Sequence, residues 1–221
     1  MTTTTIDEPV VYQGQFGEFT ITDRDRQEVI TYRAGLSVAA LCFALGVGIV
    51  LWPGALGTNQ FLVLTGLYTL FCLALGLSLW RIHIYLRPLH IALQVFWAIG
   101  LLASLAIAHL DPAPFALTLY RQPLSILGVG FVFAALTGIF FKEAFCFNRL
   151  ETKLLTPLVP VLLLGHLGGW LAITAEKWLL GVWAILFIIF ALRKTLQPIP
   201  PDIGDKSVFT YLRQSQSPPS D

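Results

Sequence analysis

The chain has 221 residues, of which 56% are hydrophobic and only 12% are charged. A soluble globular domain carries about 25% charged residues, so this chain cannot cover the surface of a water-soluble fold of its size. Its net charge of +1 also excludes the basic excess that marks nucleic-acid-binding proteins. The composition therefore predicts an integral membrane protein whose first partner is the lipid bilayer.

Residues 1–31 are predicted to form a polar arm that is partly helical. The arm opens MTTTTIDEPV, without the basic start and apolar stretch of a signal peptide, so no cleaved leader is expected. The stretch 10–21 (VVYQGQFGEFTI) alternates loosely and contains two glycines, which is typical of a small hairpin or an extended arm. Thr22 is suited to a helix N-cap, with Asp23 and Asp25 in the first turn, so a helix is expected to begin there and continue into the membrane.

A transmembrane bundle is predicted over residues 32–194. Six apolar segments lie within it, and the first five are close to the roughly 20 residues that a hydrocarbon core of about 30 Å requires. The expected spans are residues 34–52, 61–80, 89–110, 123–141, 154–173 and 178–192. Pro53 ends the first span and Pro88 precedes the third, as expected for a residue that breaks helices and favours their first turn.

The sixth segment is the shortest of the six. Its fifteen residues rise only about 22 Å at 1.5 Å per residue. It can span if the bilayer thins or if Lys177 and Arg193 reach the two interfaces. A re-entrant hairpin formed with the fifth segment is the alternative.

The distribution of lysine and arginine predicts the orientation. With six crossings and a cytoplasmic N-terminus, twelve of the 14 Lys and Arg residues lie on the inner side. Only Arg121 and Lys177 lie outside. The opposite orientation reverses the positive-inside rule at every loop. The sequence therefore predicts an all-α bundle of about six spans with both termini in the cytoplasm.

The connector at residues 141–153 (FKEAFCFNRLETK) mixes both signs of charge with aromatic residues. We expect a structured inner loop or a short interfacial helix extending the fourth span, with charges that pair with the basic loop at 81–87. A structural role is the first interpretation and docking of a partner subunit is the second. The docking residues would be Lys142, Glu143, Phe145, Cys146, Phe147, Arg149 and Glu151.

Residues 195–221 are predicted to form a proline-rich cytoplasmic tail. The sequence QPIPPDIGD is expected to be extended, and residues 207–212 (SVFTYL) to form an amphipathic stretch on the membrane surface. The final QSQSPPSD is expected to be disordered because it is polar and rich in proline and serine.

Small residues recur at four-residue spacing in several spans. Such stripes allow helix backbones to approach closely, either within one bundle or against a partner helix. The stripe residues are Ala40, Ala44, Gly48, Gly100, Ser104, Ala108, Gly130, Ala134, Gly138, Gly165 and Gly169.

The predicted spans contain no Asp, Glu, Lys or Arg. Intramembrane charges mark proton relays and ion-coupled carriers, so coupled transport is not expected. A channel or facilitator for a small uncharged solute would have to use hydroxyl and amide side chains, which more often bond back to their own helix. These residues are Thr65, Thr69, Ser78, Gln94 and Thr137.

His166 is the candidate cofactor ligand. It is expected near the middle of the fifth span, in GHLGG, where flanking glycines leave room for haem or chlorophyll. The simpler interpretation is a neutral histidine bonded to a neighbouring helix, since His83, His90 and His109 are expected near the interfaces. No metal site, catalytic residue or nucleotide-binding motif is found in the sequence, so an enzyme is not expected.

Two stretches resemble a known family: VYQGQFGEFTITDRDRQEVITYRAG before the first span and FKEAFCFNRLE in the connector. They are similar to integral membrane proteins of cyanobacteria and plastids classed as a domain of unknown function, over roughly residues 10–195. The resemblance implies a cyanobacterial thylakoid or plasma membrane and assigns no site residues. The leading functional hypothesis is a non-enzymatic assembly, stabilising or accessory factor for a membrane complex, for example a photosynthetic one; a channel and a haem- or chlorophyll-binding protein are the alternatives.

Overall fold

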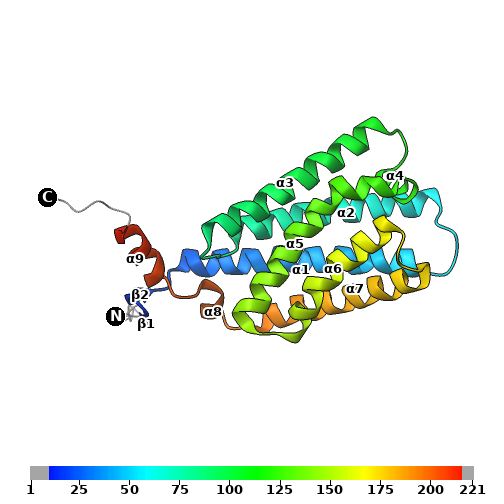
Figure 1. The fold of residues 1–221 in the computed structure, drawn as a ribbon. Helices are drawn as coiled ribbons and strands as arrows, with labels where there is room; N and C mark the ends of the chain where they lie inside the picture. Colours follow the sequence, from blue (N-terminus) through cyan, green and yellow to red (C-terminus); the bar gives the residue numbers. More distant parts are fainter. Residues whose placement is uncertain (1–9, 216–221) are drawn as a thin grey trace, which may run out of the picture.

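Six helices within residues 10–215 of the computed structural model are long and apolar enough to cross a membrane, which confirms the predicted all-α bundle of about six spans (Figure 1). The structure describes those residues, so the expectations for residues 1–9 and for the last six residues of the tail lie outside it. The six helices are α1 (Asp23–Leu51), α2 (Thr58–Arg81), α3 (Arg87–Leu110), α5 (Ile126–Phe147), α6 (Leu150–Gly168) and α7 (Ile173–Leu196).

Shorter elements mark the two ends of the bundle. They are β1 (Val11–Gly14), β2 (Gly17–Thr20), α4 (Phe115–Arg121), η1 (Pro123–Ser125), α8 (Pro200–Ile203) and α9 (Ser207–Ser215). The strands, α8 and α9 lie at one end, named here the hairpin end (Figure 1). The α1–α2, α3–α4 and α6–α7 connections lie at the opposite end, named the loop end.

The described part of the N-terminal arm, from residue 10 onward, contains the hairpin and the helix start that the sequence predicts. Strands β1 and β2 pair antiparallel, with Val11 opposite Thr20. Thr22 then caps α1: its hydroxyl accepts a hydrogen bond from the Asp25 amide, and the Asp25 carboxylate accepts one from the Thr22 amide at 2.8 Å. This reciprocal capping box satisfies donors that the first turn leaves free.

The sixth segment is a helix long enough to cross the membrane, which favours a full span over the re-entrant alternative. Helix α7 has 24 residues and rises about 36 Å at 1.5 Å per residue. The sequence window was too short because it stopped at charged residues. Glu176 and Lys177 lie in the first turns of α7 and Arg193 and Lys194 in the last, so the helix continues past the apolar run at both ends.

The connector at 141–153 is two helix ends joined by a tight turn. Helix α5 continues to Phe147 and α6 begins at Leu150. Asn148 makes the turn in the left-handed conformation, with φ of 52°. The expectation that a helix extends the fourth span is therefore confirmed, and a separate inner loop is not formed within these residues.

Small residues allow helices to make close contact at several points. A Cβ on Gly35 would lie 2.7 Å from the Ala74 carbonyl oxygen of α2. A Cβ on Gly100 would lie 2.5 Å from the Val132 amide nitrogen of α5. Close contacts of this kind drive the association of helices in lipid, because the hydrophobic effect does not favour helix–helix contact there.

The remaining stripe residues occupy varied positions. Gly138 faces Leu93 of α3, Gly165 faces Leu171, and a Cβ on Gly48 would meet no described atom within 4 Å. Ala40 and Ser104 are buried, Ala44 and Gly130 are half-buried, and Ala108, Ala134 and Gly169 are exposed. Several stripes therefore point partly to the outer surface of the bundle.

Candidate functional site

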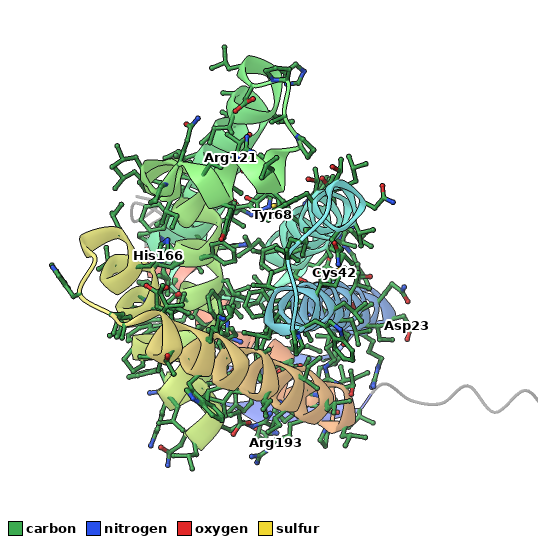
Figure 2. All side chains as sticks on the ribbon, turned by 90° about the vertical axis from the view of Figure 1, so that its right-hand side faces the viewer. Asp23, Cys42, Tyr68, Arg121, His166 and Arg193 are labelled. Carbon is green, nitrogen blue, oxygen red and sulfur yellow. The ribbon has the colours of Figure 1, made fainter. Side chains whose placement is uncertain are left out.

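A cavity of about 1000 Å³ opens at the loop end of the bundle. It lies between α1, α2, α4, α5, α6 and α7, and most of its wall is apolar. Representative wall residues are Val50, Phe61, Leu64, Leu117, Ile126 and Leu162. Figure 2 looks onto this end and shows Arg121 of α4 and His166 of α6, which both line the cavity.

One face of α7 runs from the mouth of the cavity to its deep end. Ile173, Glu176, Lys177, Leu180 and Trp183 all line the cavity. Their spacing of three and four residues is that of a single helical stripe. The stripe changes from charged to aromatic along its length, so the cavity has a polar mouth and an apolar interior.

Aromatic side chains close the deep end. The Trp183 ring lies 4.4 Å from the Phe43 ring and 5.4 Å from the Phe133 ring, measured between centroids. Trp183 is 1% exposed, and its indole N–H has no hydrogen-bond partner within residues 10–215. A buried donor left unpaired costs about 1–3 kcal/mol, so an acceptor brought by a ligand would be favoured here.

A smaller apolar pocket of about 210 Å³ adjoins the cavity between α1 and α2. The two share Phe43, Val50, Leu64, Phe133 and Leu180. Cys42 and Phe71 also line the smaller pocket, and none of its described lining residues is an acid or a base of the Asp, Glu, Lys, Arg or His type. The pocket therefore extends the apolar interior sideways.

Ionisable side chains from the described helices surround the mouth. His166 Nδ1 lies 3.0 Å from a Glu176 carboxylate oxygen, so this carboxylate already has a partner. Arg121 and Lys177 are exposed and form no ion pair with any described residue. The mouth therefore presents two cations and one carboxylate that is already engaged.

Asp111, at the same end of the bundle, is occupied locally. Its carboxylate accepts hydrogen bonds from the Ala113 amide and the Thr118 hydroxyl, both at 2.9 Å. These bonds, with a smaller contribution from Arg121, hold the pKa of Asp111 below its usual range. Asp111 is thus an ionised structural residue that stabilises the α3–α4 connection.

The structure does not place His166 at mid-span. Helix α6 ends at Gly168, so His166 lies in its last turn at the loop end. The other histidines bond elsewhere: His90 to the Leu79 carbonyl at 2.7 Å and His109 to the Leu105 carbonyl at 2.8 Å. The span was placed too late because its apolar run continues through Leu171 after the helix has ended.

Buried ionic side chains gather at the hairpin end. Lys194 is fully buried and contacts Glu143 and Asp202, each at 2.5 Å. Arg33 pairs with Asp202 at 2.7 Å and donates to the carbonyl oxygens of Gln197 and Pro198. We name Arg33, Glu143, Lys194 and Asp202 the ionic cluster; it joins α1, α5, α7 and α8.

The cluster corrects two expectations. Glu143 does not pair with the loop at 81–87, because it turns into the bundle toward Lys142, Lys194 and Tyr32. The segment after Lys194 is not extended, because α8 folds back to bury Asp202 beside Arg33. Sequence reasoning missed the cluster since Arg33, Glu143 and Lys194 lie at the ends of apolar runs, where a solvated flank is the usual interpretation.

The predicted docking residues separate into two groups. Glu143 and Glu151 are buried, and Glu151 pairs with Arg193 at 3.0 Å. Phe147 lies beneath three cations, with Lys194 Nζ 4.2 Å from its ring centroid. Arg149 donates to the Gln197 side chain, and Lys142 pairs with Glu143. Phe145 and Cys146 are exposed at the surface.

The five hydroxyl and amide residues that a channel would have to use are not among the residues that line the cavity. Thr65, Thr69 and Thr137 donate to carbonyl oxygens of their own helices at 2.8–2.9 Å. Ser78 donates to the Tyr32 carbonyl and Gln94 to the Leu79 carbonyl. The expected back-bonding is thus seen for the three threonines, while the other two join neighbouring helices.

Comparison with known proteins identifies a family. Residues 77–211, more than half of the chain, match the model of a family described as "Uncharacterized integral membrane protein (DUF2301)". The match includes the connector, begins after the N-terminal motif, and extends past residue 195, where the resemblance seen in the sequence ended. Comparisons with curated proteins and with solved structures found no match.

Proposed function

The chain belongs to the DUF2301 family of integral membrane proteins, and from this premise we propose that it is a non-catalytic membrane protein that binds an apolar or amphipathic small molecule. The cavity of about 1000 Å³ at the loop end carries the proposal. Ligand sites are typically concave, mostly apolar, and equipped with a few polar groups. This cavity has that character from its mouth to Trp183.

The opposite end of the bundle supports binding in place of conduction. Beyond the cavity floor, Phe140, Phe187 and Phe190 are fully buried, and Phe140 packs edge to face on the other two. The ionic cluster follows them at the hairpin end. These two layers favour a site that is entered and left from the loop end.

The lysine and arginine distribution supports a cytoplasmic hairpin end. Twelve of the 14 cationic residues belong to that side, and the positive-inside rule places such a side in the cytoplasm. The cavity then opens on the face away from the cytoplasm. A thylakoid or plasma membrane location remains the prediction that the resemblance gave.

The accessory role predicted for the connector is compatible with ligand binding. Phe145 is 84% exposed and Cys146 is exposed, so they are the docking residues that a partner subunit would reach first. This role stays a prediction, as does haem or chlorophyll ligation by His166, whose Nδ1 already contacts Glu176.

Photolabelling tests the proposal. The protein is placed in phosphatidylcholine nanodiscs with a diazirine-bearing fatty alcohol or the matching fatty acid, and labelled peptides are mapped by mass spectrometry. We expect labels on the cavity residues of α1, α2 and α7. Ala116→Trp, which fills the cavity wall, is expected to remove them.

Ala106→Trp is the matched control, since Ala106 is exposed on α3 and does not line the cavity. It adds the same side chain on the outer surface and should leave the cavity labels unchanged. Labels spread evenly over all outer helix faces, and insensitive to Ala116→Trp, would show that neither probe enters the cavity.

A further inference from the structure

We propose that the ligand is an anionic amphiphile with a hydrogen-bond acceptor in its apolar body, an inference that rests on the proposed function. The acidic group lies at the mouth between Arg121 and Lys177. The apolar body fills the interior, and its acceptor oxygen receives the Trp183 indole N–H. The adjoining apolar pocket between α1 and α2 takes the end of the chain.

The charge at the mouth supports the first part of the inference, which is the acidic group of the ligand. Arg121 and Lys177 line the cavity and have no ion-pair partner among residues 10–215. Glu176, the carboxylate that lines the mouth, contacts His166 at 3.0 Å. Asp111 is held by Ala113 and Thr118. The groups left to meet a ligand are therefore cations, which favour a carboxylate or phosphate head.

The deep end carries the second part. Trp183 is the lining residue whose buried polar atom lacks a partner in the described chain. An indole nitrogen only donates, so its complement is a carbonyl, ester or hydroxyl oxygen. Both ends of the cavity thus favour acceptors: one charged and near water, the other neutral and enclosed.

The spacing along α7 sets the dimension of the ligand. Lys177 and Trp183 are six residues apart on the lining face, which is about 9 Å at 1.5 Å per residue. The apolar wall between them includes Leu180 and Phe43. A head group alone cannot reach both donors, so the ligand has a chain that bridges them.

The first experiment compares the fatty-acid and fatty-alcohol photoprobes at alkaline pH, where the carboxyl group is ionised. The wild-type protein is expected to be labelled about tenfold more by the acid, as expected for a charge-assisted hydrogen bond. The double substitution Arg121→Gln and Lys177→Gln should reduce acid labelling to the alcohol level. Alcohol labelling should not change.

A matched double substitution controls for net charge. Arg87→Gln and Lys153→Gln remove the same charge from exposed positions at the hairpin end and should preserve the preference for the acid. Equal labelling by both probes in the wild-type protein overturns the anionic inference and leaves the proposed function standing. If neither of the two probes labels the cavity, the proposed function itself is overturned.

The acceptor is tested by competition. A mid-chain keto fatty acid should displace the acid photoprobe about fivefold more effectively than the unsubstituted acid, the scale of one neutral hydrogen bond. Trp183→Phe keeps an aromatic ring and removes the N–H, so it should abolish this difference while retaining acid labelling. Equal competition by the two acids in the wild-type protein would remove the acceptor from the inference.

The same assay identifies the source of the acidic group. Nanodiscs that contain phosphatidylglycerol provide an anionic lipid from the bilayer itself. Loss of acid labelling in these nanodiscs supports the anionic class and assigns the site to a bilayer phospholipid. Acid labelling that is unchanged in these nanodiscs also supports the anionic class, and it assigns the site to a free acid.

Discussion

Lys194 shows how one buried charged side chain can connect several elements of an apolar bundle. Its ammonium group is fully buried and lies 2.5 Å from both Glu143 and Asp202. Removing ions from water is costly, and their attraction offsets the cost only when the geometry is good and further hydrogen bonds are made. Here Tyr32, Lys142 and Arg33 supply those bonds.

Lys194→Met is therefore expected to destabilise the protein by about 3–5 kcal/mol, because two carboxylates lose their shared buried cation. Arg24→Met is the control, since Arg24 is 85% exposed and its pair with Glu28 is worth about 0.5 kcal/mol or less. Thermal unfolding of the detergent-purified variants provides the comparison. Equal melting temperatures would show that the cluster is not coupled to folding.

The sequence shows where these ionic residues lie along the chain, but it does not predict whether their side chains point toward water or into the bundle. Lys194 and Glu143 end apolar runs, where a lysine or glutamate more often reaches water than the core. Whether such a side chain turns inward depends on what lies opposite. The partner, Asp202, belongs to a proline-rich segment that alone predicts no fold.

Elements are held together here by a few close contacts. Helices α3 and α5 approach at Gly100, where a Cβ would lie 2.5 Å from the Val132 amide nitrogen. Because this neighbour is backbone, it cannot move aside as a flexible side chain would. The small residue is therefore required by the approach of the two helices.

Gly100→Ala is expected to destabilise the protein by about 1–3 kcal/mol, because the added methyl group forces α3 away from α5. Gly48→Ala is the matched change, since a Cβ there would meet no described atom within 4 Å. Alanine also favours a helix over glycine by up to about 1 kcal/mol, so Gly48→Ala should be neutral or stabilising. Melting temperatures that fall equally for both variants would contradict this account.

The N-terminal hairpin is clasped by the segment before and within α9. The Asp205 carboxylate accepts from the Gln15 amide at 2.6 Å and from Ser207. The Phe16 and Tyr211 rings stack with centroids 4.1 Å apart. Residues 207–212 belong to helix α9, and these contacts show that the helix packs on the hairpin.

The clasp should open in acid. The hydrogen bond from Gln15, then those from Ser207, hold the pKa of Asp205 below its usual range. A carboxyl group with a lowered folded pKa contributes stability above its unfolded pKa, about 4, and loses it as the pH falls through the folded value. The amide protection factors of residues 14–17 should therefore decrease when the pH drops below about 4.

Asp205→Asn is the control for this titration. An amide does not ionise, so the protection of the hairpin in this variant should be lower at neutral pH and independent of acidification. Protection that declines with acid equally in both proteins would assign the effect to another group.

At the scale of the whole molecule, the sequence predicted the architecture and not the site. Hydrophobic runs, prolines and flanking cations indicate six spans because each is a local property of the chain, and the described residues contain six such helices. The cavity is not local: α1, α2, α4, α5, α6 and α7 each contribute wall residues that look like ordinary lipid-facing or core positions. Helix α4, which carries Arg121 to the mouth, was missed because seven residues give too little periodicity.

The native cysteines allow the orientation of the whole molecule to be measured. Cys146 is exposed at the hairpin end, whereas Cys42 and Cys72 are buried. With that end in the cytoplasm, a membrane-impermeant maleimide should label Cys146 only after the membrane is opened. Ala55→Cys, placed in the exposed α1–α2 connection of a Cys146→Ser protein, should be labelled in intact cells that carry the protein in their plasma membrane, because it lies at the loop end. Labelling of Cys146 in intact cells, with protection of the Ala55→Cys position, would turn the bundle over and open the cavity to the cytoplasm.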